Sequence, residues 1–210
     1  MKTTQHQILD RIRRTFGGDG AVVTPRDFLD LAGRDAVDQA LNRLVRSGAL
    51  IRVGRGLYHL PRRNDALGIT IPPDADKVAD ALGRQTGSRV APSPAVTANR
   101  LGLSTQIPAK PIYMTSGRSR SVRVGARTFR LKHASRMPDT HSPVGRVIQA
   151  IQGRGKDIDQ HDLVRLRGTL SDKGCRDLID QARDHAGWVI DIARRIAAVP
   201  SDTRELVQHG

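Results

Sequence analysis

The sequence is poor in several residue types that common protein classes require. Its 210 residues include one cysteine, Cys175, so the chain can form neither an internal disulfide nor a cysteine cluster for zinc. Its aromatic residues are three Phe, two Tyr and one Trp, too few for a surface that binds single strands by stacking bases on rings. No apolar run approaches the ~20 residues of a membrane span, and the N-terminal MKTTQHQILDRIRRTF lacks a signal-peptide core. We therefore expect a cytoplasmic protein with no membrane partner.

Acidic residues are absent from one long stretch of the chain. Lys and Arg total 35 against 21 Asp and Glu, a formal charge of +14. Between Ala81 and Pro138 there is no acid, whereas Lys and Arg recur throughout. A general preference of the sequence for Arg over Lys explains which basic residue is used, but it does not explain the absence of Asp and Glu from this stretch. This segment is therefore expected to face a polyanion.

The first 61 residues have the pattern of a winged helix-turn-helix DNA-binding domain. Apolar spacing predicts helices at about 4–16, at 24–31 with Thr24 as cap, and at about 34–47. The apolar stretches 51–53 and 57–60 then flank Gly54-Arg55-Gly56, which is typical of a short hairpin with a glycine-rich tip. Three helices followed by this hairpin predict a winged helix at 1–61.

The remainder predicts a linker at 62–73, a basic α/β unit at 74–138 and a helical C-terminal part at 139–199, with a flexible tail at 200–210. In the α/β unit we expect helices from Asp74 to about Gln85 and from Pro94 to Leu103. Strands are expected at 112–115, 122–124 and 127–133. The helical part can pack with this unit as one domain. The fold class is α+β.

The third helix of a winged helix enters the major groove, where side chains opposite its core face contact base edges. The candidates are Arg34, Asp38, Gln39, Asn42, Arg43 and Arg46. Gln and Asn can bind adenine and Arg can bind guanine, whereas Asp38 accepts from cytosine or orients an Arg. The same pattern is typical of an ordinary solvated helix face, and the adjoining hairpin favours the DNA-binding interpretation.

Further DNA contacts are expected from the hairpin and from the acid-free segment. Arg55 lies between two glycines at the hairpin tip, where it could enter a minor groove, and Arg52 is placed for a phosphate. A period of two in 122–132 separates polar from apolar residues on opposite faces. The expected phosphate-contacting or basic face comprises Arg118, Arg120, Arg123, Arg127, Arg130 and Lys132.

An enzyme is the alternative from a different class. The seven His are scattered, without a His-x-x-x-His pair, a nucleophile elbow or a Walker-type loop. Asp157, Asp159, His161 and Asp162 form a tight cluster that could hold a divalent ion in a nucleic-acid-processing enzyme. Helix capping before the apolar run that starts at Leu163 is the favoured interpretation. We therefore expect no enzymatic activity, no metal and no cofactor.

The segment VDQALNRLVRSGALIRVGRGLYHLP, Val37 to Pro61, resembles the N-terminal winged helix of AbiEi-type antitoxins of bacterial abortive-infection (type IV) toxin–antitoxin systems. The match lies in ALNRL, IRVGRGLY and the closing Pro61, and it continues through KPIYMTSG, RLKHAS and HAGWV. The resemblance implies a transcriptional autorepressor that binds its own operator on double-stranded DNA. It also implies that the protein counteracts a nucleotidyltransferase-like toxin, without necessarily touching it. A stand-alone winged-helix regulator without a toxin is the alternative within this class.

Overall fold

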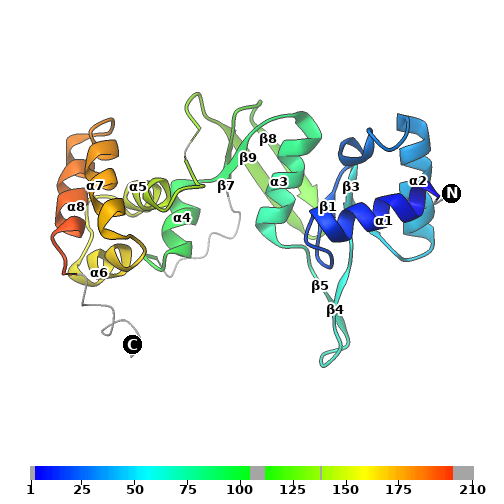
Figure 1. Cartoon of the computed structure of the whole chain (residues 1–210), viewed down its shortest axis with the longest axis horizontal. Helices are drawn as coiled ribbons and strands as arrows, with labels where there is room; N and C mark the ends of the chain where they lie inside the picture. The colour runs from blue at the N-terminus through cyan, green and yellow to red at the C-terminus, as the bar shows by residue number, and fades with distance from the viewer. Residues whose placement is uncertain (1–2, 105–111, 138, 201–210) are drawn as a thin grey trace. The chain divides into compact units, whose positions relative to one another are not determined.

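The computed structural model describes residues 3–104, 112–137 and 139–200 (Figure 1). The fold is mixed α+β, and the chain divides into two compact units. Unit 1 comprises residues 1–90 and 115–135, and unit 2 comprises residues 91–114 and 136–210. The chain leaves unit 1 within β6 (Val90–Pro92) and returns within β7 (Ile112–Thr115), two strands of a sheet of order β6-β7-β9-β8. The tail predicted at 200–210 lies outside the described residues except for Pro200.

Helices and a small sheet form the N-terminal part of unit 1. Its elements are α1 (Thr4–Thr15), β1 (Val22–Val23), the 3-10 helix η1 (Pro25–Phe28), α2 (Arg34–Arg46), β2 (Ile51–Gly54) and β3 (Leu57–His59). The strands form an antiparallel sheet of order β1-β3-β2, in which His59 lies opposite both Val22 and Ile51. Apolar side chains at helical spacing, among them Ile8, Ile12 and Leu41, are completely buried in one core.

The expected second helix at 24–31 is shorter than predicted. It is a single 3-10 turn, in which the Asp27 carboxylate accepts a hydrogen bond from the Thr24 N–H at 2.9 Å. Phe28 is fully buried, whereas Leu29 is 44% exposed. Leu31 and Ala32 pack partly buried against the same core although they lie beyond the 3-10 turn, so their burial does not require a longer helix.

The segment 62–73, expected to be a linker, contains a hairpin of β4 (Arg62–Asn64) and β5 (Ile69–Ile71). Asn64 Oδ1 accepts a hydrogen bond from the Leu67 N–H at 3.2 Å, and Gly68 takes a φ of 64°. Asn commonly stabilises a turn by accepting a hydrogen bond from the nearby backbone, and Gly commonly supplies the positive φ that a turn requires. Asn64 and Gly68 favour a turn within the segment, whereas the prediction of a linker rested on the Pro72-Pro73 pair at its end.

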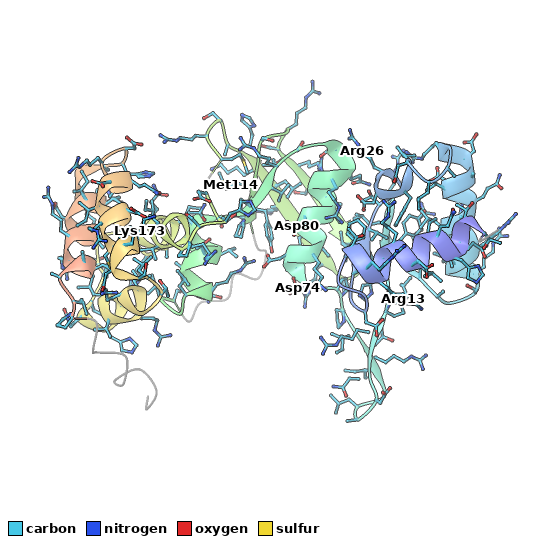
Figure 2. All side chains as sticks on the ribbon, in the orientation of Figure 1. Arg13, Arg26, Asp74, Asp80, Met114 and Lys173 are labelled. Carbon is cyan, nitrogen blue, oxygen red and sulfur yellow. The ribbon has the colours of Figure 1, made fainter. Side chains whose placement is uncertain are left out.

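The rest of unit 1 consists of α3 (Ala75–Thr86), β8 (Arg120–Val124) and β9 (Arg127–His133), all close to their predicted bounds. Asp74, labelled in Figure 2, begins α3 by accepting from the N–H groups of Asp76 and Lys77. β8 and β9 pair with Val122 opposite Phe129. The segment 74–138 is therefore divided: α3 and the β8–β9 hairpin lie in unit 1, and residues 91–114 lie in unit 2.

Unit 2 is helical, as expected for 139–199. Its helices are α4 (Pro94–Arg100), α5 (Pro143–Arg154), α6 (Gln160–Gly168), α7 (Asp172–Ala182) and α8 (Gly187–Ala197). Thr97 of α4 donates to Gln149 Oε1 of α5 at 2.8 Å, and Leu166, Leu178 and Ile196 are completely buried. Cys175 is buried in the same core. Among the described residues, no helix combines the length and apolar character needed to cross a membrane.

Candidate nucleic-acid interface

Helix α2 separates apolar and polar side chains onto opposite faces. Val37, Ala40, Leu41 and Leu44 are buried in the core of unit 1. Most of the predicted base-contacting residues are exposed, namely Arg34, Gln39, Asn42, Arg43 and Arg46. At 3.6 residues per turn, Gln39, Asn42 and Arg46 lie on the side away from the core, whereas Arg34 and Arg43, nine residues apart, lie on opposite flanks of the helix. The exposed side of α2 therefore carries polar groups that can donate to or accept from base edges.

Arg34 and Asp38 form an ion pair one turn apart on this helix. Arg34 Nε lies 2.8 Å from Asp38 Oδ2, and the Arg34 side chain is 61% exposed. The hydrogen bond to Asp38 raises the pKa of the Arg34 guanidinium. Of the two roles expected for Asp38, orienting an Arg is the one this geometry supports.

A groove of about 300 Å³ lies between α2 and the β2–β3 hairpin. We call it the α2–hairpin groove; its lining includes Arg34, Asp38, Asn42, Arg52, Arg55, Tyr58 and Gln85. Three guanidinium groups face one carboxylate there, so the groove is positive. Burial raises the pKa of Tyr58, whose phenol therefore stays neutral. The groove brings together five of the eight residues predicted for the helix and the hairpin; Gln39, Arg43 and Arg46 lie outside its lining.

The tip of the β2–β3 hairpin is bonded to two other elements of unit 1. Gln85 of α3 donates its Nε2–H to the Arg55 carbonyl at 2.8 Å, and the Gly125 N–H donates to the Val53 carbonyl at 2.8 Å. The Arg52 and Arg55 side chains remain exposed. Sequence reasoning missed Gln85, because the glycine-flanked tip indicated a turn but not what packs against it.

The β8–β9 hairpin has a basic face, as the period of two predicted. Arg123, Arg130 and Lys132 are exposed on the face opposite the buried Val124 and Leu131. Arg118 is exposed just before β8. Arg127 is exposed where the hairpin turns, but it lies opposite the buried Val124, so the structure places it at the edge of the apolar face and not on the basic face.

The assignment of Arg120 to this basic face is corrected by the structure. Arg120 lies opposite Leu131, and so on the same face as the apolar residues. Its Nη2–H groups donate to the Leu82 carbonyl at 3.1 Å and to Thr86 Oγ1 at 3.4 Å, both on α3. The alternation that exposes Arg123 turns Arg120 inward, and its guanidinium joins β8 to α3.

The carboxylates of the acidic cluster in unit 2 accept hydrogen bonds from other groups of the protein. Ligand atoms of Asp159, His161 and Asp162 lie within 4.8 Å of one another. Asp159 Oδ1 caps α6 by accepting from the Asp162 N–H at 2.8 Å, and the buried Asp162 accepts from Arg154 Nε at 3.2 Å. Helix capping and this ion pair account for both carboxylates, so the cluster supplies no argument for a metal.

The chain matches the model of a family of unknown function, DUF6088, over residues 7–174, and it belongs to that family. The matched range includes the α2–hairpin groove, the basic face of β8–β9 and most of the helices of unit 2. No curated protein matches the sequence.

Proposed function

We propose that the chain is a DNA-binding transcriptional repressor and that the N-terminal part of unit 1 is a winged helix-turn-helix. The element order α1, β1, η1, α2, β2, β3 and the strand order β1-β3-β2 agree with that architecture. The observation that carries the proposal is the α2–hairpin groove, in which Arg34, Asn42, Arg52 and Arg55 converge from two elements. A helix beside a basic hairpin suits a duplex, because one enters a groove while the other contacts the backbone.

Each basic element has a distinct role in this proposal. Exposed residues of α2 contact base edges, with Arg43 suited to guanine and Gln39 and Asn42 to adenine. Arg52 and Arg55 contact the backbone and the minor groove. The basic face of β8–β9 adds phosphate contacts, which strengthen binding to every sequence alike. The net charge of +14 favours the same partner.

We further propose that the repressor is an AbiEi-type antitoxin that acts on its own operon and counteracts a nucleotidyltransferase-like toxin. The support is the resemblance of the segment 37–61, which contains most of α2 and the whole β2–β3 hairpin. Direct contact with the toxin is not part of this proposal. A toxin-like gene beside the gene for this chain favours the antitoxin, and its absence favours a stand-alone regulator.

Footprinting with the full-length protein tests repression. On the DNA upstream of its own gene, the protein is expected to protect a discrete site and to reduce expression of a reporter placed behind it. Protection that does not differ from that of random DNA would contradict the proposal. Cleavage of the probe that requires Mg²⁺ and is lost in Asp159→Asn would instead favour an enzyme. Growth of cells that express the neighbouring toxin, with and without this chain, tests the antitoxin activity.

A further inference from the structure

We propose that α3 and the β8–β9 hairpin hold the β2–β3 hairpin in its DNA-contacting position, and that Gln85 is the positioning residue. The inference rests on the proposed function. It makes the DNA-contacting module larger than the 1–61 segment that the sequence predicted, since Gln85 and Gly125 both lie beyond it.

Three hydrogen bonds join these elements in a closed circuit. Gln85 Nε2 to the Arg55 carbonyl, at 2.8 Å, joins α3 to the hairpin tip. The Gly125 N–H to the Val53 carbonyl, at 2.8 Å, joins the β8–β9 turn to β2 directly before this tip. Arg120 Nη2 to the Leu82 carbonyl, at 3.1 Å, joins β8 to α3. A shift of the tip relative to either support would therefore break a hydrogen bond to the Arg55 carbonyl or to the carbonyl of the residue that precedes the tip.

The glycines at the tip depend on this packing. Gly56 has a φ of 65°, and a Cβ at this position would lie 2.8 Å from Gln85 Nε2. A Cβ on Gly54 would lie 3.3 Å from the Arg123 carbonyl. Glycine therefore serves here for close approach to α3 and β8 as well as for the turn.

Holding the backbone in place affects the exposed Arg55 side chain directly. A tip with glycine on both sides samples many conformations when nothing restrains it, and DNA binding would then have to order it. The two carbonyl contacts order it beforehand, which lowers the entropic cost of binding. Gln85 also lines the α2–hairpin groove beside Arg34 and Arg55. The positioning residue and the residues it positions thus share one site.

The substitution Gln85→Ala in the full-length protein tests the proposal. It removes the donor to the Arg55 carbonyl and leaves every predicted DNA-contacting side chain in place. Operator affinity is expected to fall about 2- to 10-fold, the cost of ordering one flexible residue on binding. Gln181→Ala is the matched control, because Gln181 is also a helical glutamine but lies exposed on α7 of unit 2. The control is expected to bind as the parent does.

A double-mutant cycle separates positioning from a general structural effect. If Gln85 acts through Arg55, then Arg55→Ala reduces affinity less in the Gln85→Ala protein than in the parent. Fully additive losses would overturn the proposal. Should Gln85→Ala fail to fold, Gln85→Met keeps the length of the side chain without its donor and enters the same cycle.

A measurement without DNA distinguishes failure of this inference from failure of the proposed function. Amide hydrogen exchange at residues 54–56 is expected to accelerate in Gln85→Ala, with an unchanged circular dichroism spectrum. Exchange at the parent rate overturns the positioning role, whatever the protein binds. If exchange accelerates but the parent does not bind its upstream DNA, the contact holds the tip and it is the proposed function that fails.

Discussion

Arg84 of α3 and Asp27 of η1, 57 residues apart in sequence, form an ion pair with Arg84 Nε 3.0 Å from Asp27 Oδ1. The Asp27 side chain is 5% exposed and that of Arg84 is 35% exposed. Arg84 also donates to the Val22 carbonyl at 2.8 Å, and its guanidinium lies 4.9 Å from the centroid of the Phe16 ring. One side chain of α3 therefore contacts three separate segments of the N-terminal part.

We expect Arg84→Ala to lower the free energy of unfolding by about 1 to 3 kcal/mol. It leaves the buried Asp27 carboxylate without its ionic partner, and partial exposure of Arg84 keeps the loss below that of a fully buried pair. Urea titration measures the change. Arg194→Ala is the control, since its pair with Asp191 spans 3.7 Å and both side chains are mostly exposed. The control should change stability by less than about 0.5 kcal/mol; equal losses in both variants would contradict the assignment.

His59 predicts a dependence of stability on pH. It is 1% exposed, and its Nε2 has no partner among the described residues. Burial, followed by the charge of Lys77, lowers the pKa of His59 below its ordinary value of 6.5. The unfolded chain therefore binds the proton more readily. The stability contributed by the neutral imidazole is present above about pH 6.5 and is lost as the pH falls towards the lowered pKa.

Unfolding in urea at about pH 7.5 and pH 5.5 measures this effect. His59→Phe keeps a buried ring but cannot titrate, so it is expected to lose less stability on acidification than the parent does. An unaltered pH dependence in His59→Phe would show that other groups are responsible.

Arg43→Ala and Arg55→Ala should weaken operator binding in different ways. A bidentate contact of Arg43 to guanine predicts a loss of about 1 to 3 kcal/mol and relaxed specificity at one base position. Loss of Arg55 from the hairpin should weaken binding without that relaxation at a single position. Titrations against operators altered one base at a time measure both. Arg13→Ala, on α1 and outside the groove lining, is the control. Parental binding by both variants, with folding verified by circular dichroism, would refute the assignment of α2.

The basic face of β8–β9 predicts the salt dependence of binding. Each phosphate contact adds about 0.9 to the magnitude of the slope of log affinity against log salt. Replacing Arg123, Arg130 and Lys132 by Gln should therefore flatten the slope by up to about 2.7, with little change in preference among sequences. Arg120 is left out, because it bonds to α3.

A second triple variant controls for net charge. Lys173, Arg176 and Arg183, exposed on α7 or just after it in unit 2, are replaced by Gln, which removes the same total charge. Its salt slope should stay close to the parent's. Equal slopes for the parent and the β8–β9 variant would remove that face from the proposed interface and leave α2 and the β2–β3 hairpin within it.

The contact between Thr97 and Gln149 predicts non-additive stability changes in unit 2. Gln149 is 2% exposed; its Oε1 accepts from Thr97 Oγ1, and its Nε2 has no partner among the described residues. Thr97→Val leaves the whole amide unsatisfied and should lower stability by about 1 to 3 kcal/mol. Adding Gln149→Met removes the unsatisfied amide and should recover much of this loss. Thermal or urea unfolding of the single and double variants measures it, and a double variant less stable than Thr97→Val would contradict the explanation.

Local sequence patterns determined the main elements. Helical apolar spacing and caps placed α2 and α3 within a residue or two, because a helix depends on neighbours three and four positions away. The strand that exposes Arg123 and buries Val124 could also be predicted locally, because side chains alternate between the two faces of a strand. The glycines likewise predicted the turn of the β2–β3 hairpin. Because the apolar spacing identifies the buried side of α2, it also identifies the exposed side. The candidate DNA-contacting residues of this helix could therefore be predicted from the sequence.

Only the tertiary structure decided which elements hold one another. Nothing near Gln85 in the sequence indicates the Arg55 carbonyl, and nothing near Arg120 indicates α3. The boundary of unit 1 likewise passes through β6 and β7 and not through the segment 62–73. These outcomes depend on contacts between residues about 30 or more positions apart, which form when apolar faces pack and buried donors find acceptors. The sequence by itself determines the faces that must be buried, and the packing of those faces determines which distant polar groups become partners.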